Sequence, residues 1–233
     1  GDMKKIFLFI FSLLFIFNNS AIALVTVDIT RGNLDPLPIA VSPLHVESGS
    51  KDVKDGEKVI KNVGEKISKV IEVNFKRSGL FNPLKKDSFV QNPDIAHVKP
   101  RFEDWRLIKA QALVTGKVIV TDEKLRVEFR LWDVVAAKEM IALAFSTTPK
   151  NWRRVAHIIS DKVYKRLTGE EGYFDTRIIY VSETGKKTQR YKKLAIMDQD
   201  GANVKYLTLG NELVLTPRFS PKNQLVTYLS YFR

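Results

Sequence analysis

The chain has 233 residues, with 38 lysines and arginines against 26 acidic residues, no cysteine, and a formal net charge of +12. The absence of cysteine excludes disulfide bonds, and the length suits one large domain or two modest ones. Basic and acidic residues interleave along most of the chain, and no aromatic RNA-binding consensus accompanies the short basic clusters. We therefore expect a solvated basic surface rather than a nucleic-acid partner.

The first 23 residues have the layout of a cleavable secretory signal. Lys4 and Lys5 precede an apolar run from 6 to 17, and small residues stand at Ala21 and Ala23, the positions that a signal peptidase requires. The alternative, a membrane-spanning helix, needs roughly 20 apolar residues, more than this run contains. We expect cleavage after Ala23, which leaves 210 residues with a charge of +11.

The residues that follow predict an extended arm over 24–36. Val25, Val27 and Ile29 alternate with polar residues, and this is the period of a β-strand. Pro36 and Pro38 lack the N–H groups that a full ladder of hydrogen bonds needs. The sequence thus predicts a strand-competent arm that a stiff hinge joins to the next domain.

Residues 37–169 predict a domain in which two helices pack on a sheet. Apolar residues recur at three- and four-residue spacing from 57 to 77 and from 152 to 167, and Gly79 and Gly169 follow these amphipathic helices. A buried strand at 39–41 precedes the first helix. Three strands, at 112–121, 125–133 and 138–147, are joined by links of hairpin length, and 92–105 is expected to be irregular. The predicted fold is α+β, with two helices on a small mixed sheet that is mostly antiparallel.

From residue 170 to 233 the chain changes to short strands at near-even spacing. Strand signals at 177–182, 194–197, 213–218 and 225–228 alternate with polar turns, a pattern typical of β-propeller blades. The stretch holds one four-stranded blade and the start of another, whereas a propeller needs about four to eight blades. We therefore expect 170–233 to be the start of a truncated propeller.

The sequence contains no recognisable catalytic constellation. It has no G-x-S-x-G nucleophile elbow, and its histidines, His45, His97 and His157, lack metal-ligand spacing. The stretch Asp198-Gln199-Asp200-Gly201 begins like a calcium loop, but its glycine comes at the fourth position instead of the sixth, so we interpret it as a tight hairpin turn. We predict no enzymatic activity, no cofactor, no metal and no small-molecule substrate.

Several stretches together resemble the TolB family. TGEEGYFDTRIIYVSE, LAIMDQDGANVKYLT and PRFSP resemble the domain junction and first blade of that family. RFEDWRLIKAQALVTGKV resembles its N-terminal domain, and VTVDITRGNLDPLPIAV its mature start, so the resemblance covers 24–233. It implies a periplasmic protein of the Tol-Pal envelope system, with an α/β domain followed by a six-bladed propeller. We expect a monomer.

The resemblance also implies two protein partners. In this family the N-terminal arm binds the C-terminal domain of TolA, an inner-membrane energy transducer, and the propeller binds Pal, a peptidoglycan-associated lipoprotein. The implied role is outer-membrane integrity, especially during constriction at cell division. The arm would bind TolA by strand addition through Leu24, Val25, Thr26, Val27, Asp28, Ile29, Thr30, Arg31, Gly32, Asn33, Leu34 and Asp35.

Alternatives remain open for both the arm and the function. Val25, Val27 and Ile29 are expected to bury one face against the partner, while Asp28 replaces a residue that is more often apolar in the family. The arm can instead pack on the chain's own propeller, or alternate between docked and released states. The alternative functions are a propeller-linked hydrolase and a basic protein that binds an anionic surface.

Overall fold

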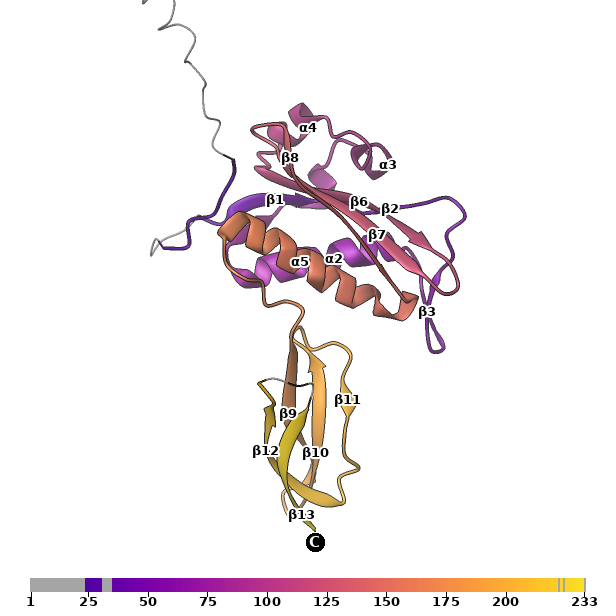
Figure 1. Cartoon of the computed structure of the whole chain (residues 1–233), viewed down its shortest axis with the longest axis vertical. Coiled ribbons are helices and arrows are strands. Elements are labelled where there is room, and N and C mark those ends of the chain that lie inside the picture. The colour runs from indigo at the N-terminus through magenta and orange to yellow at the C-terminus, as the bar shows by residue number, and fades with distance from the viewer. Residues whose placement is uncertain (1–23, 31–34, 222, 224, 233) are drawn as a thin grey trace, which may run out of the picture.

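A computed structural model describes residues 24–30, 35–221, 223 and 225–232, and the expected signal segment lies outside these residues. The chain forms two parts, one with the elements from β1 to α5 and the other with β9 to β13 (Figure 1). In the part of the chain that is described, no helix combines the length and apolar character needed to cross a membrane.

The first part contains one mixed sheet in the order β5-β1-β6-β7-β8, with β2 paired to β6. Its antiparallel half confirms the three strands predicted between 112 and 147. The sheet is mixed, as predicted, because β1 pairs in parallel with both β5 and β6. The strands are β1 (Leu37–Val41), β2 (His45–Val46), β5 (Phe81–Pro83), β6 (Ala112–Val120), β7 (Leu125–Asp133) and β8 (Lys138–Thr147).

Two helices, α2 (Val63–Ser78) and α5 (Trp152–Thr168), cover one face of this sheet. Their apolar stripes form the main core with alternate residues of β7, which are buried on this face. Both helices end as predicted at glycines in the left-handed region, Gly79 with φ 73° and Gly169 with φ 82°. The first helix starts later than predicted, because 53–60 forms the hairpin β3 (Val53–Asp55) and β4 (Lys58–Ile60).

The opposite face carries short helices where an irregular segment was expected. They are η1 (Lys86–Ser88), α3 (Pro93–Ala96) and α4 (Phe102–Leu107). The Asn92 side chain accepts the Asp94 N–H at the start of α3, and Trp105 of α4 is buried in a second core cluster. The Gln91 side chain joins the segment by accepting hydrogen bonds from the Trp105 indole and the Arg101 N–H. These local contacts give 86–107 its order.

The second part consists of two small sheets. A three-stranded sheet contains β9 (Arg177–Lys186), β10 (Gln189–Asp198) and β11 (Lys205–Tyr206), and a separate ribbon contains β12 (Glu212–Phe219) and β13 (Val226–Phe232). A first sheet followed by the beginning of a second agrees with the predicted start of a propeller, although the first sheet has three strands in the described residues instead of the four of a complete blade. The ribbon's own ladder is irregular between Leu215 and Arg218, where Thr216 has φ 45°.

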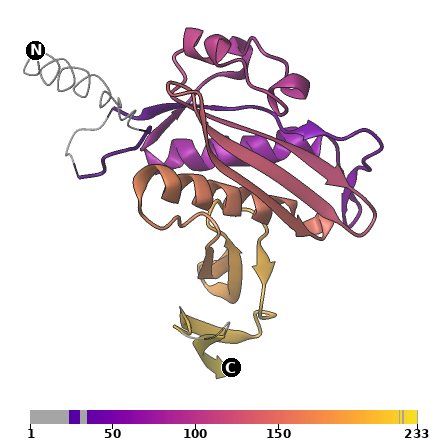
Figure 2. The same ribbon diagram turned by 45° about the horizontal axis from the view of Figure 1, so that its top comes forward.

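The second part attaches on the helix side of the first part, away from α3 and α4, and both views show this placement (Figure 2). The link between α5 and β9 is held closely. Asp161 of α5 accepts the N–H groups of Phe174 and Asp175 at 2.7 and 3.1 Å, and Phe174 is buried. A Cβ atom on Gly172 would lie 2.5 Å from the Asp161 Cα atom, so only glycine fits this approach.

Candidate functional site: the docked arm and the domain junction

Residues 24–30 of the arm lie against the first part of the chain. Val25 and Val27 are partly buried against the main core. The Val27 N–H donates to the Leu167 carbonyl at 2.7 Å, and the Val25 N–H donates to Asp133 Oδ2 at 2.7 Å. The arm is thus docked by two backbone donors and two apolar side chains.

Both acceptors, the Leu167 carbonyl and Asp133 Oδ2, would lack a hydrogen-bond donor among the described residues without the arm. Leu167 lies in the last turn of α5, where carbonyl groups have no partner within the helix. Asp133 ends β7 and is fully buried, and its other oxygen accepts the Ala136 N–H at 2.8 Å in the turn that leads to β8. Because an unpaired buried acceptor costs free energy, the arm completes these two groups.

The arm differs from the predicted strand in its second half. Residues 24–28 are extended without a ladder, and a turn follows in which Thr30 donates to Asp28 Oδ1 from its N–H and its hydroxyl, at 3.0 and 2.6 Å. Ile29 is 37% exposed, so two of the three predicted apolar residues pack. Residues 31–34 lie outside the described part.

The remaining described residues of the predicted site differ in burial. Leu24 is half-buried, and Thr26 and Asp35 are exposed. The alternative that the arm packs on its own propeller is wrong for the described residues, since their contacts are with α5, β7 and the core of the first part.

A second site lies at the other end of α5, where the second part of the chain contacts the first. Arg153 forms an ion pair with Asp200, and the two side chains are 23% and 9% exposed. Arg77 of α2 donates to the Gln199 carbonyl at 3.0 Å, and the Gln199 amide donates to Asn74 Oδ1 at 3.1 Å. The turn after β10 therefore docks onto both helices.

His157 lies at the centre of this junction. It is 2% exposed, and its Nδ1 accepts a hydrogen from the Asn74 amide at 3.0 Å. Its Nε2 has no hydrogen-bond partner and lies 3.6 Å from Asp200 Oδ2. Burial lowers the pKa of His157 below its ordinary value, and this effect outweighs the nearby Asp200 carboxylate, which acts in the opposite direction. The imidazole is thus neutral near pH 7.

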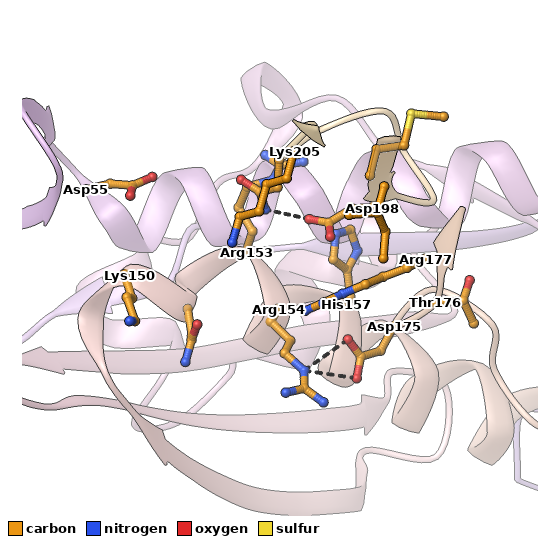
Figure 3. A pocket seen from close by; sticks show the side chains of 14 residues that line it. Asp55, Lys150, Arg153, Arg154, His157, Asp175, Thr176, Arg177, Asp198 and Lys205 are labelled. Carbon is orange, nitrogen blue, oxygen red and sulfur yellow. Dashed lines mark hydrogen bonds and ion pairs between the residues drawn. The ribbon is translucent and has the colours of Figure 1, made fainter. Parts of the chain in front are cut away.

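A cavity of about 210 Å³ opens beside His157 (Figure 3). Its walls carry charges of both signs, and the Arg154 side chain reaches Asp175 at 3.3 Å. A cavity of this size is below the roughly 300–1,000 Å³ of typical ligand pockets. With its mixed charges it resembles a polar gap between domains more than a substrate site.

One group at the junction brings potential metal ligands together. Ligand atoms of His157, Asp198 and Asp200 lie within 4.8 Å of one another. The Asn74 hydrogen on Nδ1 leaves the proton of neutral His157 on Nε2, the atom that faces the carboxylates. Arg153 also pairs with Asp200, so this donor set does not fit a cation.

The sequence showed the turn at the junction but not its contacts. The tight turn predicted at 198–201 is confirmed, with the Gly201 N–H donating to the Asp198 carbonyl at 2.9 Å. The meeting of Asp200 with His157 joins residues more than forty positions apart, and spacing along the chain could not reveal it. The other two histidines, His45 and His97, stack at 4.5 Å, and His45 contacts Asp94 of α3 at 2.6 Å.

Comparison with known proteins gives consistent matches along the chain. Residues 25–140 match the family model of the TolB amino-terminal domain, and 164–233 match that of the TolB beta propeller domain. The chain is 70% identical over 227 residues to a Tol-Pal system protein TolB from Pelagibacter ubique (strain HTCC1062). That match covers 97% of this chain and 50% of the relative, so the chain spans about half the length of the curated relative.

A solved structure agrees with the fold. The crystal structure of TolB from Acinetobacter baumannii matches with a TM-score of 0.69 and 22% sequence identity. The match covers 89% of this chain and 47% of that structure. At this identity the match shows that the fold is shared.

Proposed function

The chain belongs to the TolB family of Tol-Pal system proteins, and from this premise we propose that it is a non-enzymatic periplasmic scaffold. Removal of residues 1–23 leaves the arm over 24–36, the α/β domain over 37–169 and the start of the propeller over 170–233. The scaffold links a TolA-like transducer in the inner membrane to a Pal-like lipoprotein. The link supports outer-membrane integrity and constriction during cell division.

The observation that carries this proposal is the way in which the arm is held. Its Val25 and Val27 N–H groups and its two valine side chains make the docking contacts. An extended segment that adds to the edge of a partner's sheet uses the same kind of groups, with backbone hydrogen bonds for affinity and alternate side chains for specificity. Docking and partner binding therefore compete, and the arm alternates between its own domain and the transducer.

The expected affinity follows from the small number of contacts. About four to six backbone hydrogen bonds would each return roughly 1 kcal/mol net. Much of this gain is offset by the cost of ordering the arm and of releasing it from α5. Binding on the order of micromolar is expected, which suits a reversible link.

The second partner belongs to the propeller. The relative is about twice as long as the described match, and we assign the Pal-type contact to propeller surfaces that lie mostly outside residues 170–233. The junction at Asp200 and His157 holds this part of the chain against α2 and α5. The same polypeptide can thus present a released arm and a docked propeller.

Calorimetric titration with the C-terminal domain of a TolA-type transducer tests the proposal. One chain begins at Leu24 and the other at Pro36, and both end at Arg233. Micromolar binding by the first and none by the second supports arm recognition. Equal binding by both places the contact on the folded domain and contradicts the proposal. Binding that collapses with added salt supports instead the anionic-surface alternative, since screening acts on charge-driven contacts.

A further inference from the structure

We propose that Asp133 is the receptor for the α-ammonium group that signal cleavage creates at Leu24. The inference rests on the proposed function, because it requires export and cleavage after Ala23. Cleavage then makes the arm able to form its full docked contact, through a charge that the uncleaved chain does not have.

The first observation is the environment of Asp133. Its side chain is fully buried, and its oxygens accept only the N–H groups of Val25 and Ala136 among the described residues. A buried carboxylate is strongly destabilising unless it is paired with a cation or satisfied by several hydrogen bonds. Two neutral donors leave part of the four-site acceptor capacity of this carboxylate unused. Asp133 therefore has room for a cationic donor.

The second observation is the position of the arm. The Val25 nitrogen is 2.7 Å from Asp133 Oδ2, and Leu24 is the residue before it. Neighbouring Cα atoms are only about 3.8 Å apart. The terminal nitrogen of Leu24 is therefore one residue away from a nitrogen that already contacts this carboxylate. A free ammonium group carries three hydrogens and a full positive charge. A peptide nitrogen in the uncleaved chain carries one hydrogen and no charge.

The third observation is that no lysine or arginine side chain forms an ion pair with Asp133 in the described part of the chain. Arg106 of α4 donates to the carbonyls of Val134 and Val135 at 3.0 and 3.2 Å. Lys165, in the last turn of α5, pairs with Glu171. Lys138, opposite Asp133 in the β7–β8 ladder, and Arg166 of α5 form no ion pair with Asp133 in the described part of the chain. Asp133 therefore has no cationic partner among these side chains, and the terminal ammonium of the cleaved arm would supply one.

This pair gives docking a defined pH dependence. An α-amino group ordinarily has a pKa of about 7.7–8.0, and the Asp133 carboxylate raises the pKa of the docked group. Docking is therefore strengthened at pH values where the amine is charged, and the gain is lost as the pH rises through that raised pKa. Transducer binding therefore requires that the ion pair between the terminal ammonium group and Asp133 is broken.

Hydrogen exchange of the Val27 amide measures docking, because this amide donates to Leu167. Two chains are compared at pH 7, one that begins at Leu24 and one with a single glycine added before Leu24, which moves the charge away. The expected result is roughly tenfold faster exchange in the extended chain, an effect between those of exposed and buried ion pairs. The same comparison in Asp133→Asn is expected to show no difference. Asp122→Asn, which changes an exposed carboxylate in the turn between β6 and β7 and leaves the arm untouched, is the matched control and keeps the tenfold ratio.

Equal exchange in the two unmutated chains overturns the proposal, as does a ratio that survives in Asp133→Asn. Because Asp133→Asn could loosen the turn at Ala136, titration of the terminal amine by NMR provides a second test that needs no mutation. A pKa of about 9 in the chain that begins at Leu24 supports the pair, and an ordinary value of about 8 contradicts it. N-terminal sequencing of the exported protein tests the cleavage site separately, and transducer titration tests the proposed function, so the three failures are distinguishable.

Discussion

The two ends of α5 hold their neighbours by different chemistry. At the C-terminal end the arm is bound through the Val27 N–H, the Leu167 carbonyl and half-buried valines. At the N-terminal end the turn after β10 is bound through the side chains of Arg153 and Asp200. Backbone groups and valines are contacts that any strand edge supplies, whereas the ion pair needs two particular side chains. The arm contact is therefore exchangeable and the junction is specific.

The expected free energies of the two contacts also differ, with the arm held more weakly than the junction. Each arm hydrogen bond contributes about 1 kcal/mol net, while fixing each backbone residue costs about 1–2 kcal/mol, so the arm is held only marginally. Removing one partner of a largely buried ion pair costs about 3–5 kcal/mol, because the other charge remains without compensation. The junction should survive conditions in which the arm is released.

The largest expected effect is at the junction. Asp200→Ala leaves the Arg153 guanidinium without its partner and is expected to cost about 3 kcal/mol of stability. Urea unfolding measures the loss, and limited proteolysis of the 170–176 link is expected to accelerate in the variant. Val27 amide exchange should be unchanged, since the arm is at the opposite end of α5.

Asp122→Ala is the matched control for that change. Asp122 forms an ion pair with Lys51 in which both side chains are more than half exposed, so no measurable loss of stability is expected. A loss in Asp200→Ala no greater than in this control would show that the junction is as weak as a surface contact, and the contrast between the ends of α5 would fail.

A smaller effect is expected in the arm. Val27→Asp removes an apolar contact of about 2 kcal/mol, and this corresponds to roughly thirtyfold weaker transducer binding. The melting temperature should stay close to that of the unmutated chain, because Val27 is only partly buried against the main core. Thr26→Asp, at the exposed neighbour, is the control and should bind nearly normally. A melting curve that drops sharply in Val27→Asp would make the arm part of the core.

The smallest effect is the pH dependence of the junction. Burial lowers the pKa of His157 below 6.5, so the folded state binds fewer protons than the unfolded state as pH falls. Stability is therefore complete above about pH 6.5 and declines below it, by at most about 1.4 kcal/mol per pH unit for one group. Urea unfolding between pH 7.5 and 5 checks this slope. His157→Gln should reduce it, and an unchanged slope would assign the titration to other groups.

The sequence predicted the elements whose signals are local. Both helices, their terminal glycines and the strands between 112 and 147 follow from periodicity and caps. The β3–β4 hairpin was not predicted, because Ile60 fits the helical spacing of α2 while its backbone pairs with Val53. The short helices α3 and α4 were not predicted either, because they are held in place by the buried side chains of Gln91 and Trp105.

The site was partly predictable for the same reason. Alternation at Val25 and Val27 identified the apolar contacts of the arm, but Ile29 leaves the pattern because Asp28 forms a turn with Thr30. The acceptors of the arm, Leu167 and Asp133, are more than a hundred residues away along the chain. Contacts of this kind arise only when the sheet and α5 are assembled.

We propose that the arm leaves α5 when it binds a TolA-type partner. Because the chain has no cysteine, spin labels can be placed at Thr26→Cys on the arm and Lys162→Cys on α5 alone. Pulsed EPR then reports the distance between them while a TolA-type C-terminal domain is added. A short distance is expected in the free chain, and a longer one is expected to replace it with the same midpoint as calorimetric binding. A short distance that persists at saturation would show that the docked arm is not the binding element.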